Sequence, residues 1–377
     1  MAITYPLSLP TVTGFRASEL QPRSVVGVVA SPFTGQQQVY AWPGQWWQWA
    51  IELPPMSEAS AAIWAAFFLA LNGPEGTFYL GPSVRKASAA ALSHFYKVGS
   101  GAVANSTTLP LGAGLGRPNA GDWLQVGAIN RLIYAEALDN AAWTKIGATV
   151  SADADTAPDG AATADRLVED GSYGGHFITQ ASAVALGRMT FSVYAKLGTA
   201  TTRRVALQIY NSVDGTIART VFDLNAGTVQ STGAGSAAIT SIGSGWYRLE
   251  VSGTAYGAGV SVIIEQTNAT DTVYTGDSTS YVKLWGAQLN PGSRAMAYLA
   301  TTSAAIVQDI YLHRVTQRSY TAYECDVFPR LRAAYAANTP ITTLNPVGLF
   351  RAAGLPVEAY DPHKLCQGMT FTAFESL

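Results

Sequence analysis

The chain has 377 residues, of which 48% are hydrophobic and only 13% are charged, and its formal net charge at pH 7 is −2. This length suits two domains, and the charged share is about half of that in ordinary soluble domains. A charge this close to neutral gives no electrostatic basis for binding nucleic acid or an anionic membrane. The start of the chain does not resemble a signal peptide, and no apolar run is long enough to span a bilayer. We therefore expect a turn-rich globular protein without nucleic-acid binding or membrane insertion.

The reactive residue types do not indicate a metal centre. Cys325 and Cys366 are the two cysteines of the chain. Without an export signal we expect reduced thiols, although the sequence leaves their pairing open. The four histidines and two cysteines show neither Cys-x-x-Cys nor His-x-x-x-His spacing, so no metal site and no cofactor is predicted. Sandwich lectins often hold a structural calcium ion, but no acidic cluster in this sequence indicates one.

The first fifty residues have the pattern of β-strands. Ser24–Val29 is rich in β-branched residues, and Gln36–Trp42 and Trp47–Leu53 alternate on either side of Pro43-Gly44. Two alternating runs separated by Pro-Gly predict a hairpin. The three tryptophans between residues 46 and 49 would suit a sugar platform, but aromatic residues at a period of two more often lie in a core or a subunit interface, which is the interpretation we favour.

One segment carries the signals of a helix. Ser57 is a suitable N-cap with Glu58 in the first turn, and Asn72-Gly73-Pro74 is a typical helix end. An apolar stripe is expected to face the core: Ile63, Trp64, Phe67, Phe68 and Leu71. A strand is predicted at Gly76–Pro82, followed from Lys97 to Gly121 by a loop rich in Gly, Ser, Asn and Pro.

Two strand-like runs far apart in the sequence match each other. GDWLQVG (Gly121–Gly127) alternates like a strand and then stops, and IYLHRV (Ile310–Val315) begins without a nearby partner. We predict that these runs pair and that a domain is inserted between them. The predicted domains are residues 1–128 with 307–377, and the insert 129–306.

The insert differs in composition from the segments around it. Ala, Thr, Gly and Ser dominate, and turn signals recur about every ten residues. Many short strands at this spacing predict an antiparallel sandwich. The predicted strands are Met189–Leu197, Arg204–Tyr210, Thr220–Leu224, Trp246–Gly253, Val260–Gln266 and Tyr281–Leu289.

The outer segments together resemble distal-tail-type tail proteins of long-tailed bacteriophages. The motifs that carry this resemblance occur in the same order once the insert is removed; they are Ser31–Met56, the helix with GTFYLGP, GDWLQVG, YLHRV, FPRLR (Phe328–Arg332), NPVGLFR (Asn345–Arg351) and GMTFTAFES. The resemblance implies a β-rich barrel or sandwich domain with one helix. It also implies a hexameric homo-oligomeric ring between the tail tube and the tail-tip or hub proteins, and hence a place in the virion.

The insert resembles lectin-like carbohydrate-binding modules of phage tail and fibre proteins. The matching residues are NRLIYAEALDNAAWTK (Asn130–Lys145), APDGAATADRL (Ala157–Leu167), MTFSVYAK (Met189–Lys196), SGWYRLEV (Ser244–Val251) and VKLWGAQL (Val282–Leu289), before Tyr298. Such modules are antiparallel jelly-roll sandwiches whose first and last strands lie side by side. That arrangement brings the ends of an inserted domain together.

The candidate site residues are aromatic or polar side chains suited to sugar contacts. They are Tyr173, His176, Tyr210, Trp246, Tyr256 and Trp285. For both tryptophans, filling the sandwich core is the favoured alternative. No catalytic residue is predicted. Glycosidases need two opposed carboxylates, and the available ones read mainly as turn formers: Asp159, Asp165, Glu169, Asp170, Glu265 and Asp277.

The sequence therefore predicts a non-enzymatic tail-tip ring subunit whose insert binds host surface polysaccharide for adhesion. Several weakly binding inserts on one ring would bind with avidity. Two alternatives remain open: a glycan-degrading tail enzyme, and a purely structural insert that packs on a neighbouring tail protein.

Overall fold

The computed structural model describes residues 5–7, 9–10, 14–82, 96–112, 118–184, 187–199, 201–269, 271–319, 323–354, 356–360 and 365–376. The fold is mainly β, and α1 (Glu58–Leu71) is the one helix in these ranges, which confirms the predicted fold class. The chain divides into two compact units: unit 1 comprises Met1–Gly127 and Asp309–Leu377, and unit 2 comprises Ala128–Gln308. Within the described ranges no helix is long and apolar enough to cross a membrane.

The first sheet of unit 1 has the order β1-β2-β28-β26-β4, with β27 and β3 also paired to β28. Helix α1 packs on it around Trp49, Trp64 and Phe371. The strands are β1 (Ala17–Ala30), β2 (Gln37–Glu52), β3 (Met56–Ser57), β4 (Phe78–Leu80), β26 (Gly348–Ala352), β27 (Val357–Tyr360) and β28 (Leu365–Glu375).

The hairpin predicted across Pro43-Gly44 is wrong. β2 runs unbroken through these residues and pairs with β1, and the hairpin turns at residues 31–36 instead. Pro43 is accommodated because the register shifts there, from Ser24↔Gln45 to Val26↔Ala41. A bulge of this kind leaves extra residues out of the ladder, so the missing N–H of proline breaks no regular pair.

The helix has the predicted ends. Ser57 accepts a hydrogen bond from the Ser60 backbone N–H, and Asn72 closes the helix in the left-handed conformation, with φ of 50°. The predicted stripe is wrong at Ile63, which is 51% exposed, whereas Ala61 is buried. The buried positions follow the spacing set by Trp64 and Leu71, which leaves residue 63 at the margin of the apolar face.

The second sheet of unit 1 has the order β25-β6-β23-β24-β5. It contains the two runs on either side of unit 2, since Val126 of β6 pairs with Tyr311 of β23. The pairing predicted for GDWLQVG and IYLHRV is therefore confirmed. The strands are β5 (Thr108–Pro110), within the predicted loop, β6 (Trp123–Val126), β23 (Tyr311–Arg318), β24 (Glu324–Phe328) and β25 (Ile341–Thr342).

Two titratable side chains are buried in this second sheet. Cys325 is a free thiol, and burial raises its pKa to about 12; the side chain of Cys366 lies outside the described residues. His313 is fully buried, and burial lowers its pKa to about 4. Both groups are therefore neutral at pH 7 and serve as core side chains.

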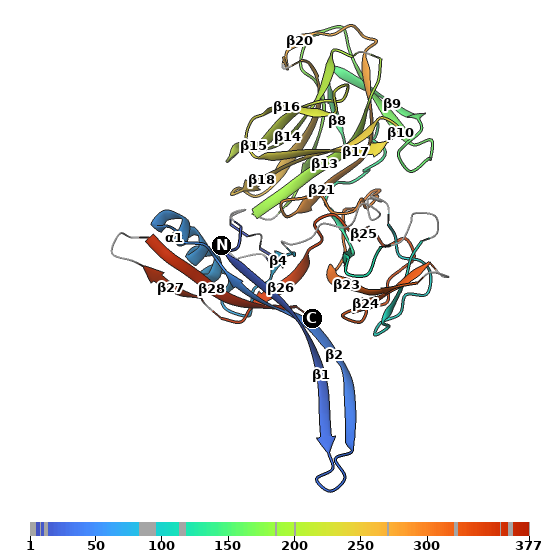
Figure 1. Cartoon of the computed structure of the whole chain (residues 1–377). Helices are drawn as coiled ribbons and strands as arrows, with labels where there is room; N and C mark the ends of the chain where they lie inside the picture. Colours follow the sequence, from blue (N-terminus) through green and yellow to red (C-terminus); the bar gives the residue numbers. More distant parts are fainter. Residues whose placement is uncertain are drawn as a thin grey trace. The chain divides into compact units, whose positions relative to one another are not determined.

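Unit 2 is a sandwich of two six-stranded antiparallel sheets (Figure 1). Sheet I has the order β17-β18-β13-β21-β10-β9, and sheet II has the order β16-β15-β14-β19-β12-β8. Sheet I consists of β9 (Ala148–Asp155), β10 (Ala164–Glu169), β13 (Gly187–Leu197), β17 (Ser236–Gly243), β18 (Trp246–Ala255) and β21 (Tyr281–Pro291). Sheet II consists of β8 (Thr144–Ile146), β12 (His176–Ser182), β14 (Arg203–Asn211), β15 (Gly215–Asp223), β16 (Thr228–Thr232) and β19 (Val260–Asn268).

The core of unit 2 lies between the two sheets. Phe191 and Val251 of sheet I face Leu207 and Ile264 of sheet II in one buried cluster. Because side chains alternate along a strand, this cluster fixes which residues lie on the outer face of each sheet. The six predicted strands are present, most with ends displaced by a few residues, and only Thr220–Leu224 is much extended, as β15.

The two ends of unit 2 lie side by side. β7 (Ile129–Asn130) pairs with β22 (Ile306–Val307), and the Gln308 side chain accepts a hydrogen bond from the Ala128 backbone N–H at 3.0 Å. Asn130 is fully buried, and its side-chain oxygen accepts hydrogen bonds from the backbone N–H groups of Leu132 and Leu289. These contacts fix the ends of unit 2 beside the last residues of β21.

Candidate functional site

The outer face of sheet I is covered. Tyr194 and Trp285 lie on this face, because their neighbours along β13 and β21 belong to the core between the sheets. Both side chains are nevertheless almost completely buried, at 0% and 2% exposure. The polar residues of the same face are buried as well: Thr190, Ser192, Arg248, Glu250, Ser252, Gln288 and Asn290.

A short chain segment, residues 294–299, forms the cover. The Ala295 N–H donates to Glu250 at 3.0 Å, and the Leu299 N–H donates to Gln288 at 2.9 Å. Between them the Tyr298 ring packs 4.5 Å from the ring of Trp285. Gly286 allows this approach, since it has a φ of 65° and a Cβ there would meet the rings of Tyr194 and Tyr298. Most of the polar groups of this face are thus hydrogen-bonded within the unit.

The outer face of sheet II is open. Residues on this face include Gln208 and Tyr210 of β14 and Ile263 of β19, because Leu207, Ile209, Val262 and Ile264 point into the core. Tyr210 is 40% exposed, and Gln208 and Ile263 are half-buried. We name this surface the open face; its members are Phe177, Thr179, Arg204, Gln208, Tyr210, Arg219, Asp223, Ser261, Ile263 and Glu265. Ala206 and Val221 lie on the same side of the sheet but are buried, at 1% exposure each.

An ion pair crosses the middle of the open face. Arg219 of β15 and Glu265 of β19 flank β14 and meet at 2.9 Å, with 25% and 12% of their side chains exposed. Ala206 pairs with both Glu265 and Val221, and its small side chain leaves room for the contact above it. Burial raises the pKa of Glu265, and the hydrogen bond from Arg219 opposes that shift. The face therefore presents a partly desolvated charged pair beside an exposed aromatic ring.

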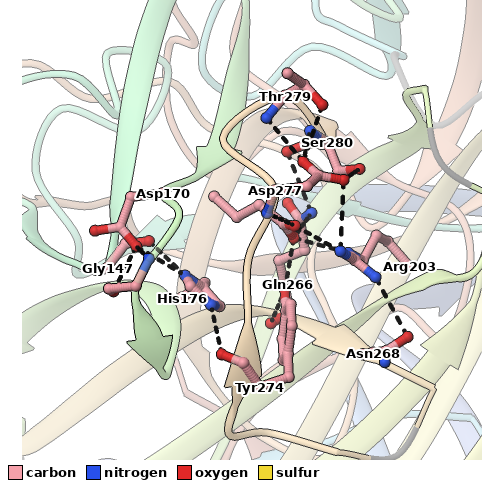
Figure 2. Close-up of polar contacts among 12 residues, drawn as sticks. Gly147, Asp170, His176, Arg203, Gln266, Asn268, Tyr274, Asp277, Thr279 and Ser280 are labelled. Atoms are coloured by element: carbon pink, nitrogen blue, oxygen red, sulfur yellow. Dashed lines mark hydrogen bonds and ion pairs between the residues drawn. The ribbon is translucent and has the colours of Figure 1, made fainter.

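A second polar cluster lies at one end of the sandwich, and there the groups are saturated. Buried Glu169 accepts hydrogen bonds from Arg203, Gln266, Tyr274 and the Asp277 backbone N–H. Figure 2 shows Arg203 pointing toward both Asn268 and Asp277, whose carboxylate also accepts from Thr279 and Ser280. These contacts hold the loop before β21 in place. The carboxylates of Glu169 and Asp277, two of the candidates for glycosidase catalysis, are therefore already bonded to neighbouring groups.

The other carboxylates named as candidates from the sequence are also hydrogen-bonded or ion-paired. Both oxygens of Asp165 accept backbone N–H groups, from Leu138 and Asp153, and burial raises its pKa to about 6. Asp159 accepts from the Ala161 N–H in its turn. Among the described residues there is no group of three or more His, Cys, Asp or Glu side chains arranged to hold a metal ion.

Three of the six residues proposed from the sequence are buried. His176 is 0% exposed, and its ring lies 2.6 Å from the Gly147 carbonyl and 3.3 Å from that of Tyr274 (Figure 2). Trp246 and Trp285 are 3% and 2% exposed. They lie on the outer face of sheet I, not in the core between the sheets that was the favoured alternative. We do not include these three in a ligand-binding surface.

The three exposed tyrosines are divided between the two ends of the sandwich. Tyr173, on β11 (Tyr173–Gly174), is 75% exposed and pairs with β20 (Tyr274–Thr275) beside the Glu169 cluster. Tyr210 lies seven residues after Arg203 on β14, about 23 Å away along a strand. Tyr256 is 77% exposed at the Tyr210 end, where its N–H donates to Asp214 in the turn after β14. Tyr210 alone of the six lies on the open face.

Sequence reasoning did not select Gln208 and Arg219, and it considered Glu265 only as a catalytic carboxylate. The sequence did contain a signal. Strict alternation along Gln208–Tyr210 puts Gln208 and Tyr210 on one face of their strand, and alternation along Val262–Gln266 does the same for Ile263 and Glu265. The sequence did not indicate which outer face a loop would cover.

No protein-family model matches the sequence, and comparison with curated proteins finds no match. Among solved structures, the chain is similar to TmCBM61 in complex with β-1,4-galactotriose, at 10% identity and a TM-score of 0.27 over 44% of this chain and 99% of that one. It is similar at 13% identity to the xylan-binding CBM22-1 domain of Paenibacillus barcinonensis Xyn10C, with a TM-score of 0.24 over 46% and 96% of the chains. The module CBM6cm-2 of Cellvibrio mixtus lichenase 5A, in complex with cellotriose, shares 13% identity over 44% and 97%, with a TM-score of 0.24. Likeness at this level does not establish what the chain binds.

Proposed function

We propose that unit 2 binds carbohydrate through the open face without cleaving it. The observation that carries this proposal is the contrast between the two sheets: one outer face is sealed, and the other presents the exposed ring of Tyr210 beside Gln208, Arg219 and Glu265. A sugar needs an aromatic or apolar platform for its C–H face, together with amide and charged groups for its hydroxyls. The open face offers both on one rigid sheet.

The absence of bond cleavage is part of the proposal. Glu265 and Asp223 are the two carboxylates among the described residues of this face, and an arginine holds each of them: Arg219 contacts Glu265 at 2.9 Å, and Arg204 contacts Asp223 at 2.8 Å. A glycosidase places two carboxyl groups about 5 to 10 Å apart on either side of the scissile bond. Glu265 therefore suits the acceptance of a sugar hydroxyl more than the paired acid and base roles of hydrolysis.

We further propose that unit 1 is a tail-tip ring subunit of a bacteriophage virion, so that unit 2 attaches the particle to host surface polysaccharide. Support comes from the sequence motifs of unit 1, which fall on strands and a helix that pack together: GDWLQVG pairs with YLHRV, and the helix packs against the closing strand β28. Tail tube and tail-tip or hub proteins are the proposed partners, and no cofactor is involved.

The sugar-binding proposal is tested by incubating the full-length chain with purified surface polysaccharides and a glycan array. We expect retention of the wild-type chain and at least tenfold weaker binding of the double variant Y210A/R219A. Y173A, altered on β11 at the opposite end of the sandwich, should bind normally. Polymer length is then measured after prolonged incubation. Equal binding by wild type and Y210A/R219A would exclude the open face, and shortening of the polymer would favour the enzyme alternative.

The tail role is tested separately, by immunoelectron microscopy of virions with an antibody against unit 1.

A further inference from the structure

The charged side chains of the open face are joined in two ion pairs. Arg219 and Glu265 meet at 2.9 Å, with 25% and 12% of their side chains exposed. Arg204 and Asp223 meet at 2.8 Å, with 16% and 15% exposed. These four are all the charged members of the open face, so its formal charges cancel. Pairs at this exposure are partly desolvated, and separating one of them is therefore costly.

The Arg219–Glu265 pair has hydrogen-bonding capacity left over. Nη2 of Arg219 donates to Oε2 of Glu265. Among the described contacts, Oε1 of Glu265 accepts no hydrogen bond and Nη1 of Arg219 donates none. Gln208 pairs with Arg219 across neighbouring strands and donates one amide N–H to Thr216 at 3.1 Å, so its amide oxygen remains an acceptor. Donors and acceptors therefore lie side by side, next to Tyr210 on the same strand face.

We infer that the open face selects uncharged sugars and excludes sugars that carry a carboxylate or sulfate group. The inference rests on the sugar binding proposed for unit 2 and names the class of glycan. A hydroxyl group both donates and accepts, so one sugar hydroxyl can accept from Arg219 while it donates to Glu265. An ionised acidic group only accepts, so it leaves Oε1 of Glu265 without a donor and brings a second negative charge beside it. Like charges placed together in this way suppress binding.

An acidic sugar also gains nothing by displacing Glu265 from Arg219. The exchange replaces one contact between an arginine and a carboxylate with another, so no ion pair is added. Only 12% of the Glu265 side chain is exposed, and a partly buried carboxylate that loses its cation is left desolvated and unpaired. The existing pair is therefore favoured over the exchanged one.

Arg204 offers no alternative cation, because each of its guanidinium nitrogens already has an acceptor. Nε donates to Gln230 at 3.0 Å, Nη1 donates to the Thr201 carbonyl at 2.7 Å, and Nη2 is paired with Asp223. Both arginines of the open face are thus held by groups of unit 2 itself. The two ion pairs act against acidic glycans, and a penalty on the wrong ligand is a general source of selectivity.

The test compares three forms of one glycan that differ in charge. The probes are a neutral oligosaccharide with primary hydroxyls, selected on the array, the same oligosaccharide with these hydroxyls oxidised to carboxylates, and the methyl ester of the oxidised form. Isothermal titration with the full-length wild-type chain at neutral pH should give an affinity for the oxidised form that is at least about tenfold weaker than for the neutral form, because like charges meet. The methyl ester has the bulk of the acid without its charge, and it should bind more tightly than the acid.

The variant E265Q tests whether the Arg219–Glu265 pair is the cause. It keeps the size of the side chain but leaves the charge of Arg219 uncompensated, so the oxidised probe should bind E265Q more tightly than the wild type, and the preference for the neutral probe should be lost. D223N is the matched control. Asp223 lies four residues from Arg219 on β15, about 13 Å along the strand, which exceeds the Debye length of about 8 Å at physiological salt. D223N should therefore keep the preference of the wild type.

A measurement on the wild type alone covers the case in which E265Q fails to fold. At about 1 M salt the Debye length falls to about 3 Å, so binding of the oxidised probe should strengthen while binding of the neutral probe stays the same. Equal affinity of the wild type for the neutral and oxidised probes would overturn the inference and leave sugar binding intact. Equal affinity for the acid and its methyl ester, a preference that E265Q retains, a preference that D223N loses, or no effect of salt would do the same. A folded wild-type chain that binds no glycan on the array would refute the proposed function itself, and the inference with it.

Discussion

The two outer faces of unit 2 contain similar residues but differ in what lies above them. Sheet I presents Tyr194, Trp285 and an Arg–Glu-containing polar row beneath residues 294–299, and its side chains are almost fully buried. Sheet II presents Tyr210, Gln208 and the Arg219–Glu265 pair, and nothing in the described contacts seals that face. Composition alone therefore does not mark a binding face. The difference comes from six residues after β21, residues 294–299, which cover the aromatic and polar face of sheet I and bury its side chains.

The contrast is sharpest if aromatic residues on the two faces respond oppositely to truncation. On the sealed face, W285A removes a side chain that packs on Tyr194 and Tyr298 and donates to Thr163 at 3.1 Å. Truncation of a buried tryptophan costs about 3–5 kcal/mol. We expect the calorimetric transition of unit 2 to shift to lower temperature, while sugar binding of the folded fraction is unchanged. If W285A abolished binding without loss of stability, the sealed face would be the ligand site.

On the open face the expected pattern is reversed. Y210A removes a side chain that is 40% exposed, so its effect on the free energy of unfolding should lie within about 0.5 kcal/mol. Loss of ring stacking and of the apolar contact area should weaken polysaccharide binding about tenfold, or about 1.4 kcal/mol. Isothermal titration with an oligosaccharide selected on the array gives the affinity. Y256A is the matched control, because Tyr256 lies at the same end but outside the open face. A larger loss for Y256A than for Y210A would move the site to the turns at that end.

More of the fold than of the candidate site could be predicted from the sequence, because the fold signals are local and the covering of a sheet face is not. Strand alternation, Ser57 and Asn72 at the helix ends, and the matching of GDWLQVG with YLHRV depend on local geometry or on pairs of motifs, and the structure contains them. The Pro43-Gly44 hairpin failed because a bulge can absorb a proline inside a strand. Trp246 and Trp285 were ambiguous because an aromatic residue on an outer strand face looks the same whether or not a distant segment covers it. That covering depends on tertiary contacts such as Ala295 to Glu250, which no local pattern encodes.

The smallest expected effect concerns pH and would refine the role of the Arg219–Glu265 pair. Burial raises the pKa of Glu265 above its usual 4.5, so this carboxylate takes up its proton at a higher pH than an exposed glutamate. Sugar binding should therefore weaken as the pH falls through the range just above 4.5. The free energy of unfolding should change in the opposite direction. A raised pKa means that protonation of Glu265 favours the folded state, so this contribution to stability is fully present below pH 4.5 and is lost as the pH rises through the pKa of Glu265 in the folded protein.

E265Q should bind about fivefold more weakly at neutral pH, because a charged and a neutral hydrogen bond differ by about 1 kcal/mol. Its affinity should not change across this pH range. Affinity titrations of wild type and E265Q against pH test the predicted loss of binding at low pH, and calorimetry at each pH tests the predicted loss of stability at higher pH. Parallel pH profiles for the two proteins would show that Glu265 supports Arg219 and does not contact the sugar.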